Sequence, residues 1–172
     1  MLRVDVPKGH DALTAALYVL TEATDSADAS SCACVESAAL LLRNLCHDPE
    51  IARFFAPGAA EAATREGGTS LLYALSRAAA ASSSLSMRAR ALSANALRAM
   101  LSSPSYGERC THALKSLDGV LELLDDARLS CRSTHGALAR CAFDDLSYVH
   151  GALHAADEGG GALHYRPPFE VF

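Results

Sequence analysis

A run of apolar positions that ends in a polar cap occurs twice in this chain. The first copy spans residues 39–49 and the second spans residues 94–104. Equivalent positions lie 55 residues apart: Leu42 with Leu97, Arg43 with Arg98, Leu45 with Met100, and Pro49 with Pro104. In both copies the apolar residues recur at helical spacing, and a proline follows where a new helix can begin. The pattern predicts a repeated helix–cap–helix unit, which is typical of helical solenoids.

A second correspondence supports this repeat. Three apolar positions recur at a spacing of 49 residues: Leu71, Leu72 and Leu75 match Val120, Leu121 and Leu124. Leu13 and Leu17 match Leu71 and Leu75 more weakly at a spacing of 58. The change from 55 to 49 predicts a six-residue insertion near residues 57–63, in a connecting loop where stacked repeats tolerate it.

The same periodicity predicts the individual elements. Residues 24–31 and 78–84 are rich in small and polar residues, and we expect loops there. Gly67-Gly68 is expected to close one helix, so that Thr69 or Ser70 starts the next. We expect helices from Asp11, over residues 32–46, after Pro49, over residues 59–68, from Thr69 or Ser70, over residues 85–101, from Ser103-Pro104, from Val120, and over residues 134–156. The predicted organisation is an extended lead-in (1–10), a helical repeat domain (11–156), and a Gly hinge with a Pro-containing extended tail (157–172).

Composition narrows the classes of function. The 172 residues are 50% hydrophobic and only 6% aromatic, and most of the apolar residues are Ala and Leu, which favour helices. The net charge is −5 and no cluster of Lys or Arg occurs, so we expect no nucleic-acid partner. No stretch approaches the roughly 20 apolar residues that a membrane span needs, and no secretory signal is recognisable. We expect a cytoplasmic protein.

The phrase Leu42-Arg43-Asn44-Leu45-Cys46 resembles the end of the third helix of armadillo repeats. The resemblance implies an all-α fold, a short armadillo/HEAT-like right-handed helical solenoid of about three repeats. Residues 36–130 are also similar to the C-terminal part of the rotatin family, armadillo-type proteins of centrioles and ciliary bases. Together these resemblances imply a non-enzymatic protein–protein interaction module, a structural or scaffold subunit of a larger assembly, with a centriolar or ciliary location. A peptide-binding adaptor of the cytosol is the alternative within the same class.

Two groups of residues are candidate partner-binding sites. Arg43 and Arg98 occupy equivalent positions, where they can bind acidic or carbonyl groups of an extended partner or pair with Asp or Glu of a neighbouring repeat. The tail exposes apolar residues after a Pro-Pro break, and it can dock on a partner or fold back onto its own repeats. The candidates in the tail are Pro167, Pro168, Phe169, Val171 and Phe172.

Catalytic and metal sites find little support in the sequence. Cys and His residues between positions 110 and 141 lack the close pairing of zinc ligands: Cys110, His112, Cys131, His135 and Cys141. We expect the six cysteines to be reduced and mostly buried, and the paired acids Asp125-Asp126 and Asp144-Asp145 to lie on solvated faces. No phosphate-binding loop or nucleophile elbow occurs, so we expect no cofactor, no small-molecule substrate and no enzyme. A Cys-dependent or metal-dependent enzyme remains the competing class.

Overall fold

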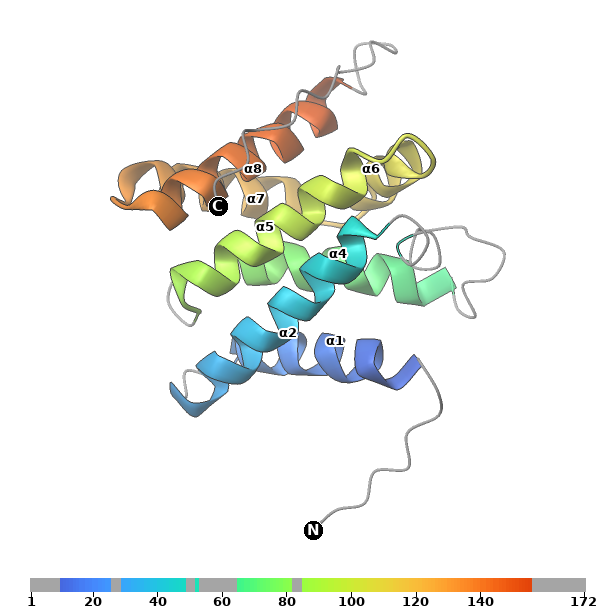
Figure 1. Cartoon of the computed structure of the whole chain (residues 1–172). Coiled ribbons are helices and arrows are strands. Elements are labelled where there is room, and N and C mark those ends of the chain that lie inside the picture. The colour runs from blue at the N-terminus through green and yellow to red at the C-terminus, as the bar shows by residue number, and fades with distance from the viewer. Residues whose placement is uncertain (1–9, 26–28, 49–51, 53–64, 82–84, 156–172) are drawn as a thin grey trace.

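The computed structural model describes residues 10–25, 29–48, 52, 65–81 and 85–155. These residues form helices and contain no strand, which confirms the all-α class for this part of the chain (Figure 1). The helices are α1 (His10–Asp25), α2 (Ala29–His47), α4 (Arg65–Ala80), α5 (Met87–Leu101), α6 (Gly107–Lys115), α7 (Val120–Ser133) and α8 (Ala137–Ala155).

The long helices are arranged in two layers. Helices α2, α5 and α8 run as nearly parallel ribbons across the front of Figure 1, and α1, α4 and α7 lie behind them. Within each layer α5 packs between α2 and α8, and α4 packs between α1 and α7. Across the layers α1 packs on α2, α4 on α5, and α7 on α8. The short helix α6 contacts α4, α5, α7 and α8 at one edge of the molecule.

Positions that match in the sequence are buried at matching places in these helices. Leu42, Leu97 and Leu146 are all buried, in α2, α5 and α8 respectively. Leu97 and Leu146 are 49 residues apart, the spacing that also relates α4 to α7. Two further sets with the same spacings of 55 and 49 are buried throughout: Val35, Arg90 and Ala139, and Ala38, Ser93 and Ala142. The three front helices therefore present the same face to the apolar core.

Two turns explain where helices begin. Ser86 precedes α5 and its hydroxyl accepts a hydrogen bond from the backbone N–H of Ala89 at 3.2 Å, an N-cap interaction. Gly107 begins α6, where its backbone approaches the carbonyl of Leu101 so closely that a β-carbon would clash. We expected this short helix to begin at Ser103-Pro104; those two residues instead form the turn before it.

Several predicted boundaries are wrong. Helix α2 begins at Ala29 rather than Cys32, and α4 runs through Gly67-Gly68, which fall in its first turn. Each glycine costs about 1 kcal/mol of backbone entropy in a helix, and the burial of Leu71, Leu72 and Leu75 in the following turns offsets this cost. Helix α4 also extends to Ala80 beyond the expected loop start, because Ala78 and Ala79 are buried in the core.

Some predictions fall on residues that the structure does not describe. These are the short helix after Pro49 apart from the helical and buried Ala52, the 59–68 element up to residue 64, the lead-in up to residue 9, and the tail from residue 157 with its candidates Pro167, Pro168, Phe169, Val171 and Phe172. Within the described helices, none combines the length and the apolar character needed to cross a bilayer.

Candidate interaction surface

A row of polar side chains crosses the three front helices and is centred on Asn95 of α5. The Asn95 amide oxygen accepts a hydrogen bond from Arg43 Nε of α2 at 2.8 Å, and His47 Nε2 lies 2.9 Å from the same oxygen. On its other side, Asn95 Nδ2 donates to a carboxylate oxygen of Asp145 in α8 at 3.0 Å. One amide therefore bridges α2 and α8, through Arg43, which lies 52 residues before Asn95, and Asp145, which lies 50 residues after it.

Asp145 is the buried anchor of this row. Its second carboxylate oxygen accepts a hydrogen bond from Arg98 Nη1 at 2.9 Å, and the two side chains are only 9% and 16% exposed. The Arg98 guanidinium also lies over the ring of Tyr148, 5.0 Å from its centroid, a cation–π arrangement. Charge-assisted hydrogen bonds of this kind are about twice as strong as neutral ones. We call Arg43, His47, Asn95, Arg98, Asp145 and Tyr148 the polar row.

The structure brings the two candidate arginines into one network. Arg98 of α5 pairs with Asp145 of the neighbouring helix α8. Arg43 of α2 is connected to this pair indirectly, because it donates to Asn95, which in turn donates to Asp145. The sequence analysis missed Asn95, and its assignment of Asp145 to a solvated face is wrong because that residue is buried. Asp144, its neighbour, is exposed as expected. The repeat spacing could have predicted that Asp145 is buried, because Asp145 lies 49 residues after Ala96, which is buried in α5.

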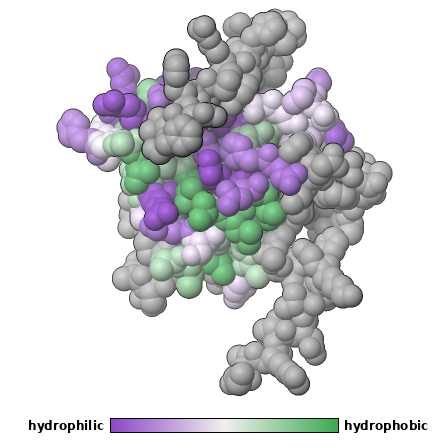
Figure 2. Space-filling model, in the orientation of Figure 1, coloured by the Kyte–Doolittle hydropathy of each residue, from purple (hydrophilic) through white to green (hydrophobic). Residues whose placement is uncertain are grey.

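The polar row lies at the surface of the front layer. Figure 2, in the orientation of Figure 1, shows hydrophilic atoms gathered over the middle of this face, above α5, with apolar surface beside them. Arg43 is half-buried, and its Nη2 group has no partner among the described residues. The row thus combines an ion pair at its centre, Arg98 with Asp145, with the partly exposed guanidinium of Arg43.

A second buried cation, Arg90, has a structural role. It is 3% exposed and takes the repeat position that Val35 and Ala139 occupy in the neighbouring front helices. Its Nε donates to the carbonyl of Ala79 at 3.0 Å, and its Nη2 lies 3.5 Å from Sγ of Cys131. Arg90 therefore satisfies a carbonyl at the end of α4 and connects α4, α5 and α7.

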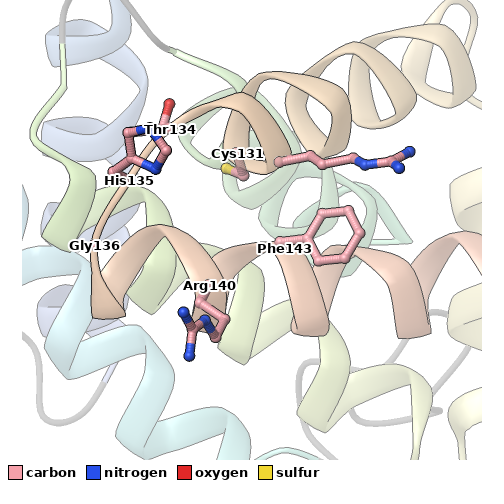
Figure 3. A pocket seen from close by; sticks show the side chains of 7 residues that line it. Cys131, Thr134, His135, Gly136, Arg140 and Phe143 are labelled. Carbon is pink, nitrogen blue, oxygen red and sulfur yellow. The ribbon is translucent and has the colours of Figure 1, made fainter.

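A cavity of about 250 Å³ lies at the turn between α7 and α8 (Figure 3). Three basic residues line it, Arg132, His135 and Arg140, and no carboxylate does. Figure 3 shows the side chains of His135 and Arg140 pointing in different directions rather than toward a common point. The volume is below the 300–1,000 Å³ that is usual for small-molecule sites. The remaining lining residues are Cys131, Thr134, Gly136 and Phe143.

The described cysteines are reduced and fall into two groups. Cys46, Cys110 and Cys131 are buried, and burial raises the pKa of Cys46 and of Cys110 to about 12. These thiols stay protonated at neutral pH and are poor nucleophiles. Cys34 and Cys141 are exposed, against the expectation of apolar burial. In the part of the chain that the structure describes, no three His, Cys, Asp or Glu side chains come close enough to hold a metal ion.

Comparison with known proteins gives no relative from which a site could be transferred. No family model, no curated protein and no solved structure matches the chain. Function must therefore be argued from the surfaces themselves, and the polar row is a partly exposed network that joins α2, α5 and α8.

Proposed function

We propose that this chain is a short armadillo-like stack of helical units and acts as a non-enzymatic protein–protein interaction module, a structural or scaffold subunit of a larger assembly. The observation that carries the proposal is the recurrence of burial at spacings of 55 and 49 residues in α2, α5 and α8. Helices that repeat the same buried face, each packed mainly on its neighbours, form an extended surface. Solenoids use such surfaces to bind other proteins.

The polar row supports a binding role for the front layer. Its fixed amide and guanidinium groups suit the carbonyl and carboxylate groups of a protein partner, which accept hydrogen bonds. Asp145 neutralises Arg98 and holds it over Tyr148, so the partner meets a preorganised surface and little side-chain entropy is lost on binding. Arg43 supplies a second, partly exposed guanidinium of the row.

The row also favours the second candidate, an adaptor for an extended peptide. Arg43, Asn95 and Tyr148 lie on three nearly parallel helices and are each partly exposed, so an extended segment crossing the helices would meet a polar group at each one. The two candidates share a surface and differ in the partner, which is a folded subunit in one case and a linear segment in the other. The resemblance to the rotatin family extends the first candidate to a centriolar or ciliary assembly.

Quantitative affinity capture with matched variants tests the proposal. Arg43→Glu reverses a charge in the polar row, and Glu122→Lys reverses an exposed charge on α7 in the back layer. We expect Arg43→Glu to lower recovery of the specific partners at least tenfold while Glu122→Lys retains them, with equal helix content by circular dichroism. Equal recovery by both variants would contradict a role for the row. Competition by peptides derived from the captured partner then separates the adaptor from the folded-subunit case.

The tail candidates are tested by deleting residues 159–172. If the tail docks on a partner, the truncated chain keeps the melting temperature of the parent and enters the assembly less efficiently. Burying two Phe and one Val contributes roughly 1.5–3 kcal/mol each before ordering costs, so either form of docking has a measurable effect. A large fall in melting temperature of the isolated chain would mean that the tail covers its own repeats.

A further inference from the structure

The turn between α7 and α8 carries a cluster of basic side chains. Arg132, His135 and Arg140 line the cavity at this turn and are all exposed, and we call these three residues the basic cluster. Residues 127–143 contain three arginines and no acidic residue, although the whole chain has a net charge of −5. The basic cluster is therefore a local concentration of positive charge in an acidic protein.

The positive charge of the basic cluster is not neutralised by the described residues. The third arginine of this stretch, Arg128, pairs with Asp125. By contrast, no hydrogen bond or ion pair within the described part of the chain involves a side chain of the basic cluster. Helix α8 begins at Ala137 beside the cluster and has no acidic residue in its first turn. Its N-terminal end therefore adds positive potential to the same turn.

The repeated helical unit does not require charge at this turn. The residues 49 positions earlier, before and at the start of α5, are Ser83, Ser86 and Ala91. Ser86 is the N-cap of α5, and Ala91 is buried. The equivalent turn of the preceding unit therefore forms with small, uncharged residues. Folding of the unit does not explain why the turn between α7 and α8 is basic.

We propose that the basic cluster binds an acidic segment of a protein partner, in which successive carboxylates each meet one cation. His135 and Arg140 point in different directions, so a single small anion would contact only one of them as they lie (Figure 3). An extended segment with several carboxylates can contact both. A guanidinium suits this role because it binds a carboxylate through two parallel hydrogen bonds. The cavity, which Phe143 lines in part, accepts an apolar side chain of the segment beside these contacts.

The number of cations favours a protein segment over a nucleic acid. Binding to nucleic acid draws its affinity from several phosphate contacts made by clustered cations, and the basic cluster offers only two arginines and one histidine. Exposed acids also flank the cluster in the sequence, Asp126 on α7 and Asp144 on α8. A continuous phosphate backbone extending over these helices would meet their repulsion, whereas a short acidic segment can end before it.

Fluorescence anisotropy of a labelled oligoglutamate peptide, titrated with the full chain, tests this inference. We expect saturable binding that weakens as the ionic strength rises, and no binding of an uncharged peptide of the same length. Arg132→Glu and Arg140→Glu should each lower the affinity at least tenfold. Arg109→Glu is the matched control, because Arg109 is an exposed arginine of α6 outside the cluster, and it should bind like the parent.

Conservative variants guard against a folding defect. Arg140→Lys should keep most of the affinity and Arg140→Gln should lower it less than Arg140→Glu does, all with the helix content of the parent by circular dichroism. Absence of binding at low ionic strength would overturn the inference, as would equal affinities of the parent and both arginine-to-glutamate variants. Tighter binding of a single-stranded oligonucleotide through the same residues would overturn the choice of a protein partner.

The polar row provides an independent check. It shares no residue with the basic cluster, so the inference names a second contact and does not rest on the proposed role of the row. Loss of peptide binding in Arg43→Glu alone would place the acidic segment on the polar row and overturn the inference. Failure of the peptide to bind leaves the affinity-capture test of Arg43→Glu unaffected, so the two proposals can fail separately.

Discussion

The α2 end and the α7–α8 end of the molecule differ in the kinds of side chain that they expose. At the α2 end, the outward positions remain apolar or uncharged, as Cys34 and Leu41 show. At the α7–α8 end, positions 49 residues after the buried Leu72, Ser76, Ala79 and Leu101 hold Leu121, Asp125, Arg128 and His150. Three of these four replacements are ionic or titratable, and all four are at least partly exposed.

The comparison shows how residue type changes between positions that a neighbouring helix covers and equivalent positions that remain exposed. In the middle unit the outward residues are small or apolar and a neighbouring unit buries them. In the last unit Asp125 Oδ1 accepts from Arg128 Nη2 at 2.6 Å and lies 3.6 Å from His150 Nε2, so these groups satisfy one another in contact with water. The α7–α8 end therefore carries ion-paired groups beside exposed leucines, of which Leu129 and Leu138 are 46% and 47% exposed. The exposed middle of α2 carries uncharged residues instead, and its Leu40 and Leu41 are 38% and 39% exposed.

The largest expected effect is a difference in stability between variants of α5 or α8 and the equivalent variant of α2. Met100 and its counterpart Val149 are fully buried, whereas their counterpart Leu45 is half-buried. An unpaired carboxylate at Met100 or Val149 should cost several kcal/mol and unfold the chain. The pairing of Leu45 with Met100 in the sequence predicts equal damage from Leu45→Asp, but the partial exposure of Leu45 predicts a smaller loss.

Thermal unfolding followed by circular dichroism measures this ranking, with Leu129→Asp as the control for an exposed leucine. If Leu45→Asp unfolds the chain as completely as Met100→Asp, the α2 end is covered and the comparison fails.

A smaller effect distinguishes the two contacts of α5. Asp145→Ala leaves Arg98 buried without its carboxylate, and we expect a loss of about 3 kcal/mol in the free energy of unfolding. Arg43→Ala removes a hydrogen bond to Asn95 whose oxygen still has His47 nearby, and we expect a loss of about 1 kcal/mol. Urea unfolding of both variants, with Arg98→Ala and the double variant completing a cycle, gives the values. Equal losses for Asp145→Ala and Arg43→Ala would show that the two contacts are equivalent.

The smallest expected effect is a pH dependence of stability that arises from His150 at the α7–α8 end. Burial, with the nearby positive charges of His154 and Arg128, lowers the pKa of His150 below its ordinary value of 6.5, and Asp125 opposes this only in part. The folded state therefore disfavours the protonated imidazole. Its contribution to stability is complete above about pH 6.5 and is lost as the pH falls through the lowered pKa.

His150→Gln should accordingly flatten the fall in melting temperature between about pH 6.5 and pH 5. The other histidines are the same in both proteins, so the difference between the two pH profiles isolates His150. Parallel profiles would contradict the prediction. The hydrogen bond from Arg128 lowers the pKa of Asp125 as well, and a further loss of stability is expected as the pH falls below the ordinary value of 3.8.

The sequence predicted the features that depend only on apolar residues recurring at a fixed spacing. The pairing of Leu42 with Leu97 requires only an apolar residue at a fixed spacing, and both residues are buried at matching places. Helix boundaries were harder where local preference and packing disagree. Gly67-Gly68 indicates a helix end by local preference, yet α4 passes through both glycines because its later residues pack in the core.

The polar row was only half predictable for a different reason. Arg43 and Arg98 were found because they repeat, whereas Asn95 and Asp145 do not repeat in residue type and each acts only through partners some 50 residues away. Asp145 looks like any acid on a helix until the position of Arg98 is known. The exposure of Cys34 was equally hidden, since a cysteine at an apolar helical position reads as core unless the absence of a neighbouring unit is known.

The central claim, that matching helices differ in which of their positions are covered, is tested most directly by the alkylation rates of the chain's own cysteines. Cys34 of α2 and Cys141 of α8 are exposed, whereas Cys46, Cys110 and Cys131 are buried. Burial raises the pKa of Cys46 and of Cys110 to about 12, so these thiols stay protonated at neutral pH. Mass spectrometry follows each thiol of the folded chain in a Cys32→Ser background. We predict that Cys34 and Cys141 are alkylated at least tenfold faster than the three buried thiols. Equal rates for Cys34 and Cys46, which lie on the same helix, would contradict the account.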